Sequence, residues 1–126
     1  MIESSVVVRA ATADEDPACV DVWTAAVAAR DGVPEDSAVR VRAEAKFQVP
    51  RVACLVASAS PSSGGLDGFV LVTAPGTGRP TDPSDAAYLS LLAVRPDVQA
   101  RGVGRALLVA AVEAAAAAGH LSLIHI

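Results

Sequence analysis

Residues 91–107 read Leu91-Leu92-Ala93-Val94-Arg95-Pro96-Asp97-Val98-Gln99-Ala100-Arg101-Gly102-Val103-Gly104-Arg105-Ala106-Leu107. An apolar segment is followed by a turn at Pro96 and then by the glycine-containing start of a helix. The first N–H groups of a helix have no intrahelical partner, and this end carries a partial positive charge. Gly102 and Gly104 let a ligand approach the backbone closely, and Arg101 and Arg105 add full charges. The stretch therefore predicts a site for a phosphate-bearing ligand.

The composition predicts one α/β domain over residues 1–126. The chain is 52% hydrophobic but only 3% aromatic, so its core consists mainly of valine, leucine and alanine. Its formal net charge of −4 and its scattered basic residues argue against nucleic acid as a partner. The N-terminus lacks a basic segment followed by an apolar core, and no uninterrupted apolar run approaches the roughly 20 residues of a membrane span. We expect a cytoplasmic protein with no membrane partner.

Two cysteines, Cys19 and Cys54, have no neighbouring cysteine at metal-ligand spacing. We expect them to be buried free thiols and expect no metal site.

The pattern of apolar residues, turn residues and helix caps predicts the order strand, helix, helix, strand, strand, strand, helix, strand. The expected strands are residues 6–9, 52–57, 66–73, 87–94 and 121–126, and the expected helices are residues 17–31, 34–47 and 99–118.

Individual residues refine this order. Asp16 is the expected N-cap of the first helix, with Pro17 at its first position, and Asp14 is the alternative cap. Trp23 lies on the apolar stripe of that helix and is expected to anchor the core rather than to stack on a ligand. Gly68 indicates a bulge or a close backbone approach within its strand, and Gly119 is the expected end of the long helix.

The second helix has a charged face that includes Arg40, Arg42, Glu44 and Lys46. Two interpretations remain open at this point: an ordinary solvated face, or a lid over a substrate cleft.

Three phosphate-binding motifs compete for the glycine turn. A P-loop requires a GxxxxGK sequence followed by serine or threonine, which is absent. A dinucleotide fingerprint requires a third glycine where this chain has Leu107. That fingerprint also follows the first strand of its fold, whereas the glycine turn of this chain follows a late strand. The remaining pattern is Gln99-x-x-Gly102-x-Gly104 directly after Leu92-Ala93-Val94-Arg95-Pro96.

This pattern resembles the acyl-CoA signature of the GNAT superfamily of acyl-CoA-dependent N-acetyltransferases, and the order of elements agrees with that family over the whole chain. The resemblance implies an α/β (α+β) fold with a mixed, mostly antiparallel central sheet flanked by helices. It also implies that acetyl-CoA is a cosubstrate. The cofactor-binding residues that it implies are Leu92, Ala93, Val94, Gln99, Ala100, Arg101, Gly102, Val103, Gly104 and Arg105. The first three would offer backbone groups to the pantetheine arm, and the residues from Ala100 onward would surround the pyrophosphate.

The resemblance specifies the catalytic groups less completely. The family usually stabilises the oxyanion with a backbone amide of the splayed strand, which here would be that of Val94 or its neighbour. Many members carry a glutamate base where this chain has Tyr88, and an unperturbed tyrosine is a poor base at neutral pH. Tyr88 is therefore a candidate for orienting the substrate, with simple packing as the alternative, and Ser90 is the second polar candidate. His120 and His125 are expected to be strand-end residues.

Family members continue past the last expected strand into a further helix and two strands, so we expect the domain to be incomplete at the C-terminus. The final strand would then present an apolar edge that permits pairing in a homodimer.

The leading hypothesis is an N-acetyltransferase that moves an acetyl group from acetyl-CoA to a primary amine of a small molecule or peptide, by direct attack in a ternary complex. The alternatives are a non-catalytic acyl-CoA-binding module or inactive fragment, and an α/β domain that binds another phosphate-bearing ligand. The net charge by itself favours cationic amines.

Overall fold

A computed structural model describes residues 6–58, 66–76, 85–97, 102–120 and 123–125 of the chain. The described residues form one five-stranded sheet in the order β1-β2-β3-β4-β5. The strands are β1 (Val7–Ala10), β2 (Arg51–Ser58), β3 (Gly68–Thr73), β4 (Ala87–Val94) and β5 (Leu123–His125). The first four strands are antiparallel neighbours, and β5 is parallel to β4. This arrangement confirms the predicted mixed, mostly antiparallel sheet.

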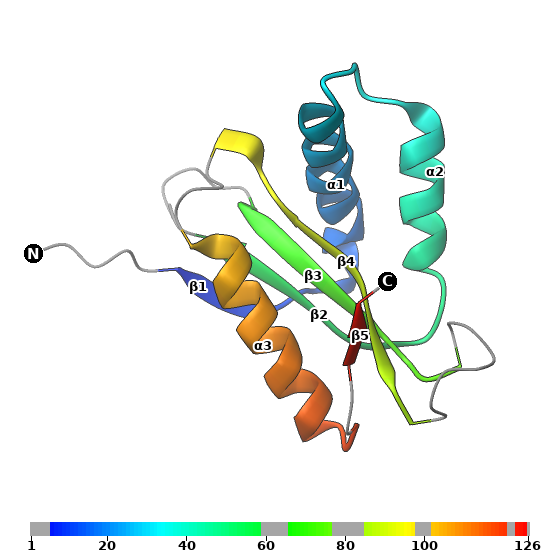
Figure 1. Ribbon diagram of the computed structural model, residues 1–126, viewed down its shortest axis with the longest axis vertical. Coiled ribbons are helices and arrows are strands. Elements are labelled where there is room, and N and C mark those ends of the chain that lie inside the picture. The colour runs from blue at the N-terminus through cyan, green and yellow to red at the C-terminus, as the bar shows by residue number, and fades with distance from the viewer. Residues whose placement is uncertain (1–5, 59–65, 77–84, 98–101, 121–122, 126) are drawn as a thin grey trace, which may run out of the picture.

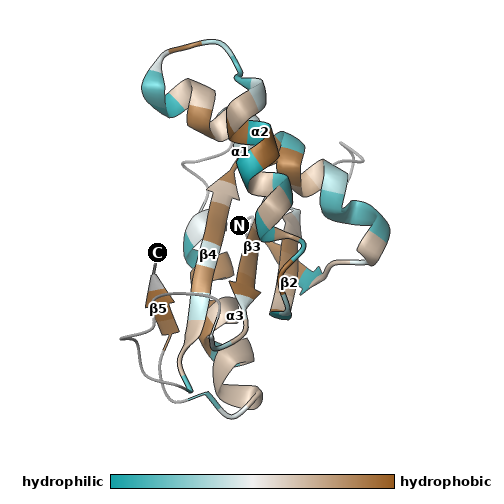
Figure 2. Cartoon of the chain, turned by 90° about the vertical axis from the view of Figure 1, so that its right-hand side faces the viewer, coloured by the Kyte–Doolittle hydropathy of each residue, from teal (hydrophilic) through white to brown (hydrophobic). Residues whose placement is uncertain are grey.

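The helices cover both faces of this sheet, as Figure 1 shows. They are α1 (Asp16–Asp31), α2 (Ser37–Lys46) and α3 (Val103–Ala117). Side chains alternate between the faces of a strand, so Phe69 and Leu71 of β3 belong to the core beneath α1 and α2. Val70 and Val72 belong to the core beneath α3. Because both faces are covered, β3 and β4 are coloured mostly as hydrophobic in Figure 2.

Helix α3 packs on the sheet through residues spaced four apart. Val103, Leu107, Ala111 and Ala115 form its buried stripe. Gly68 permits the close contact: a Cβ atom there would lie 2.9 Å from the Ala93 carbonyl oxygen and 3.0 Å from Leu107 Cδ1. The expectation of a close backbone approach at Gly68 is therefore confirmed.

Helix α3 begins at Val103 and not at the expected residue 99, because Gly102 has a left-handed φ of 78°. The helix ends as predicted, just before Gly119. This glycine has a φ of 88°, in the left-handed region that favours glycine. The N–H groups of Gly119 and His120 donate to the carbonyls of Ala116 and Ala115, each at 3.0 Å. These two hydrogen bonds form a Schellman motif, which satisfies two of the carbonyls left free at a helix end.

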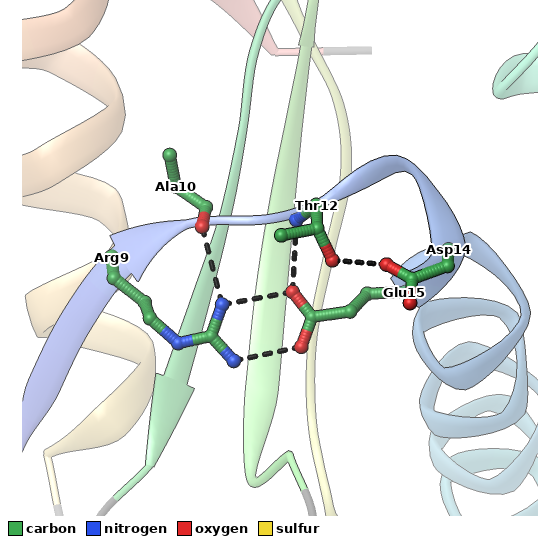
Figure 3. A network of polar contacts seen from close by, with 5 residues as sticks. All are labelled: Arg9, Ala10, Thr12, Asp14 and Glu15. Atoms are coloured by element: carbon green, nitrogen blue, oxygen red, sulfur yellow. Dashed lines mark hydrogen bonds and ion pairs between the residues drawn. The ribbon is translucent and has the colours of Figure 1, made fainter.

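The junction between β1 and α1 differs from the prediction, and Figure 3 shows its polar network. Asp16 is the first residue of α1 and not its N-cap, because a 3-10 turn over Ala13–Glu15 precedes the helix. Thr12 caps that turn, and its N–H donates to Glu15 Oε1 at 2.9 Å. Arg9 holds the same carboxylate through two hydrogen bonds of 2.8 and 2.7 Å.

Asp16, the first residue of α1, pairs with Arg51 at 3.0 Å and so links the start of α1 to β2.

Within the ranges that the structure describes, no helix combines the length and the apolar character that a membrane span requires.

Strand β4 has two irregularities near its C-terminal half, a β-bulge and a segment beyond its pairing with β5. Leu71 of β3 pairs with Leu91, but the next residue, Val72, pairs with Leu89. Ser90 is therefore an extra residue on β4, which makes a β-bulge. On its other side β4 pairs with β5 through Ala87–Leu89, so Ser90 to Val94 extend beyond the last pair with β5 that the structure describes.

Candidate functional site

The two parts of the predicted motif, the end of β4 and the start of α3, line one cavity. Leu92, Ala93 and Val94 at the end of β4 and Gly104 in the first turn of α3 line a space of about 740 Å³. We call it the motif cavity, and its other lining residues are Trp23, Ala26, Val27, Ala29, Arg30 and Ser90. Gln99, Ala100 and Arg101 lie outside the described residues.

The start of α3 borders this cavity. Gly102 has a φ of 78°, and its carbonyl accepts from the Ala106 N–H at 3.1 Å as the helix begins. A Cβ atom on Gly104 would contact Val94 Cγ2 at 3.6 Å, which is an ordinary van der Waals distance. A longer or charged side chain there would have to extend beside the cavity wall. Val103 is fully buried in the core, whereas Arg105 is exposed at the surface and does not line the cavity.

The backbone of β4 has a definite orientation here. The Arg95 N–H donates to the Asp67 carbonyl at 2.7 Å, so it points toward the β3 side of the sheet. Successive N–H groups alternate in direction along a strand, and those of Leu92 and Val94 therefore point to the opposite side. Polar backbone groups of β4 thus face away from β3 at the level of the motif cavity.

The bulge residue Ser90 is held by a neighbouring strand. Its hydroxyl oxygen lies 2.6 Å from Thr73 Oγ1, a buried contact in which either oxygen can donate. Ser90 lines the motif cavity and also a second cavity described below. It is the polar side chain that β4 contributes to both cavities.

One face of α1 forms the opposite wall, which sequence reasoning did not predict. Trp23, Ala26, Val27 and Arg30 follow helical spacing and all line the motif cavity. Trp23 packs against the core as predicted, but it is only partly buried and its remaining surface faces the cavities. In the sequence, the apolar stripe of the first helix was the only signal for this wall of the cavity, and it indicated core packing.

Tyr88, the candidate for orienting the substrate, and the two histidines expected at strand ends lie in different parts of the fold. Tyr88 is 1% exposed and does not line the motif cavity. His120 lies beyond α3 and contacts the Asp85 carbonyl oxygen through Nδ1 at 3.0 Å. His125 lies in β5, which pairs with the other end of β4.

A second cavity of about 300 Å³ adjoins the first between α1, α2 and β4. We call it the basic cavity, because Arg30, Arg42 and Lys46 line it. Its other lining residues are Trp23, Val27, Val39, Ala43, Ser90 and Leu91. The two cavities share Trp23, Val27, Arg30 and Ser90, so they meet directly above the bulge of β4.

The charged residues that line the basic cavity, among those described, are all positive. None of the described residues that line either cavity is acidic. Arg30 pairs with Asp31 at 2.9 Å outside the cavity wall, and this hydrogen bond lowers the pKa of the Asp31 carboxyl.

The two cysteines are buried free thiols, as predicted. The hydrogen bond with Cys54, together with burial, raises the pKa of the Cys19 thiol and keeps it protonated. In the part of the chain that the structure describes, no three histidine, cysteine or acidic residues are grouped to hold a metal ion.

Comparison with protein families identifies the class. Residues 22–126 match the family described as the Acetyltransferase (GNAT) family. This match spans most of the chain, so the protein belongs to the GNAT acetyltransferase family, a family of acyltransferases. No curated protein sequence matches the chain.

Solved structures have the same fold. A GNAT family acetyltransferase from Brucella melitensis in complex with acetyl-CoA has a TM-score of 0.72 at 15% identity, over 98% of this chain and 76% of its own. An aminoglycoside N-acetyltransferase in complex with CoA has a TM-score of 0.68 at 19% identity, over 99% of this chain and 78% of its own. The PaiA N-acetyltransferase from Thermoplasma acidophilum in complex with coenzyme A has a TM-score of 0.67 at 16% identity, over 94% of this chain and 77% of its own. At these identities the likeness confirms the fold.

Proposed function

We propose that this protein is an N-acetyltransferase that moves an acetyl group from acetyl-CoA to a primary amine, with both substrates bound at once. The observation that carries the proposal is the meeting of two cavities above the bulge of β4. One is lined by the acyl-CoA motif and the other leads away toward α2. Such an arrangement lets a donor and an acceptor reach the same point from two sides.

The motif cavity fits coenzyme A chemically. Gly104 leaves room beside Val94, and the N-terminus of α3 supplies N–H groups and a partial positive charge suited to a pyrophosphate. Gly102, Val103 and Arg105 belong to the same helix start, and the family resemblance extends this segment to Gln99, Ala100 and Arg101. Solved relatives of the same fold are complexes with CoA or acetyl-CoA.

When bound, acetyl-CoA supplies the thioester carbonyl. The backbone of Leu92, Ala93 and Val94 serves the pantetheine arm, and a backbone N–H of this segment, that of Val94 or Leu92, stabilises the oxyanion. These N–H groups suit the role because strand alternation directs them away from β3. We assign the buried Tyr88 a packing role.

Deprotonation of the acceptor precedes its attack, because an amine attacks only in its neutral form. The described lining residues include no carboxylate that would pair with an ammonium ion at the cavity junction, and this favours the neutral amine. Water accepts the released proton. The amine nitrogen then bonds to the thioester carbon, the C–S bond breaks, and CoA leaves as a thiolate that takes up a proton from water.

A thiol-release assay tests the proposal. The protein is incubated with acetyl-CoA and a broad panel of primary amines, and free CoA thiol is measured. We expect turnover with at least one amine and none for Gly104→Glu, while Gly104→Ala is the matched control that retains activity. Binding of acetyl-CoA without turnover of any amine would contradict the proposal and support an acyl-CoA-binding module without catalysis.

A further inference from the structure

We infer that the basic cavity selects acceptor amines that also carry an anionic group, which Arg42 and Lys46 bind. This inference rests on the proposed function, because it concerns the acceptor of the same reaction. It runs against the expectation from the net charge of the chain, which favours cationic amines.

The geometry of α2 directs both side chains to one place. Val39, Arg42, Ala43 and Lys46 are spaced as one face of a helix, and all four line the basic cavity. Arg42 and Lys46 are one turn apart, about 6 Å along the helix axis. Val39 and Ala43 add apolar surface to the same wall of the cavity.

Arg42 and Lys46 are two of the three basic residues in the described ranges that form no ion pair, and the third, Arg105, does not line the basic cavity. Five arginines form ion pairs with carboxylates: Arg9, Arg30, Arg40, Arg51 and Arg95. Arg42 and Lys46 form none in the described ranges, although acidic residues outnumber basic ones in the chain by 14 to 10. The nearest acidic residue in sequence, Glu44, lies between them on another side of α2 and does not line the cavity.

The local charge decides what enters the cavity. Charges interact over about 10 Å at moderate salt, so the cations on the wall outweigh acidic residues elsewhere on the surface. Arg42 presents several fixed donors to a carboxylate or phosphate, and Lys46 adds a mobile one. An acceptor whose amine reaches Ser90 at the junction would therefore place its anionic group against α2.

Matched acceptors test the inference. The probes are L-amino acids and their C-terminal amides, and O-phosphoethanolamine and ethanolamine; the first arm detects carboxylate preference and the second phosphate preference. We expect kcat/KM to be about tenfold or more higher for the anionic member of at least one arm, because such charged contacts differ strongly from neutral ones. The double variant Arg42→Gln/Lys46→Gln should reduce this ratio to near one and leave the KM for acetyl-CoA unchanged.

Arg40→Gln is the control, since it removes a charge from the same helix outside both cavities. It breaks an exposed ion pair with Asp21 and should keep the wild-type ratio. Thermal unfolding of each variant confirms that it is folded. Equal use of both members of each pair, preference for the neutral members, or a ratio that survives in the double variant would overturn the inference.

A binding measurement separates this inference from the proposed function. Calorimetry records the affinity of CoA-loaded protein for N-acetyl-L-amino acids and for their amides, and for N-acetylated O-phosphoethanolamine and ethanolamine. Selective binding of the anionic compounds that the double variant loses supports the inference even if no amine is turned over, in which case the proposed function fails alone. Equal affinity for both members, or no binding of either, overturns it.

Discussion

The hydroxyl oxygens of Thr73 and Ser90 lie 2.6 Å apart and connect β3 to the bulge of β4. Ser90 is the residue that breaks the register between these strands, and it faces the junction of the motif cavity and the basic cavity. A bulge bends its strand and redirects side chains. The contact therefore stabilises the bend at the point where we propose that the two substrates meet.

Thr73→Val should destabilise the protein by about 1–3 kcal/mol, because Ser90 is only 8% exposed and would lose this hydrogen bond inside the protein. Urea unfolding measures the effect. The double variant Thr73→Val/Ser90→Ala serves as the control and should cost less than the sum of the two single changes. Strict additivity would show that the two hydroxyls do not stabilise one another.

Gly68→Ala should cost about 1–3 kcal/mol, since the added methyl group meets the Ala93 carbonyl at 2.9 Å and forces the backbone or α3 to shift. Gly104→Ala is the matched control at the same helix–sheet interface. Its methyl group has ordinary contact distance at 3.6 Å and alanine favours a helix, so its stability should be unchanged or slightly increased. Similar losses in both variants would contradict the packing described for α3.

Leu107→Ala should destabilise the protein by about 2–5 kcal/mol, because Leu107 is fully buried between α3 and the sheet. The adjacent Leu108 is 44% exposed, and Leu108→Ala should change the free energy of unfolding by no more than about 0.5 kcal/mol. Denaturant unfolding of both variants checks which face of α3 is buried. A larger loss for Leu108 would reverse the assignment.

Glu15 predicts an acid-sensitive junction between β1 and α1. Hydrogen bonds from Arg9, and then from the Thr12 N–H, lower the pKa of Glu15 from 4.5 to about 2. A pKa lowered in the folded state adds stability above the unfolded value, and this stability is lost as the pH falls toward 2. Glu15→Gln should therefore be less stable than wild type at pH 6, and the difference should shrink between pH 5 and pH 3. Unfolding free energies across this range test the effect; a constant difference would contradict it.

Local signals were enough to predict most of the fold. The bounds of β4 agree with the prediction because an apolar run lies between polar turns, and the end of α3 agrees because Gly119 takes the left-handed conformation that stops a helix. The predicted start of α1 was wrong by one residue, since Thr12 and Glu15 form a 3-10 turn that competes for the cap. Short-range chemistry thus decides these elements, and an error arises where two caps compete.

The site was predictable only where it lies in one continuous stretch. Leu92 to Gly104 contain the motif, so sequence alone indicated the motif cavity's β4 and α3 walls. The bulge at Ser90 depends on how Leu71 and Leu91 align across two strands, which no local pattern encodes. The basic cavity requires α1 and α2 to pack beside β4, so the charged face of α2 remained open to two interpretations.

Titration of acetyl-CoA, followed by calorimetry and by tryptophan fluorescence, tests the central claim most directly. Trp23 is the single tryptophan of the chain and lines the motif cavity, so it reports on occupation of this site. We predict saturable binding with one site per chain and a matching fluorescence change. Free CoA should compete, and Gly104→Glu should abolish both signals while remaining folded. The absence of heat and of any fluorescence change at millimolar acetyl-CoA would contradict the account.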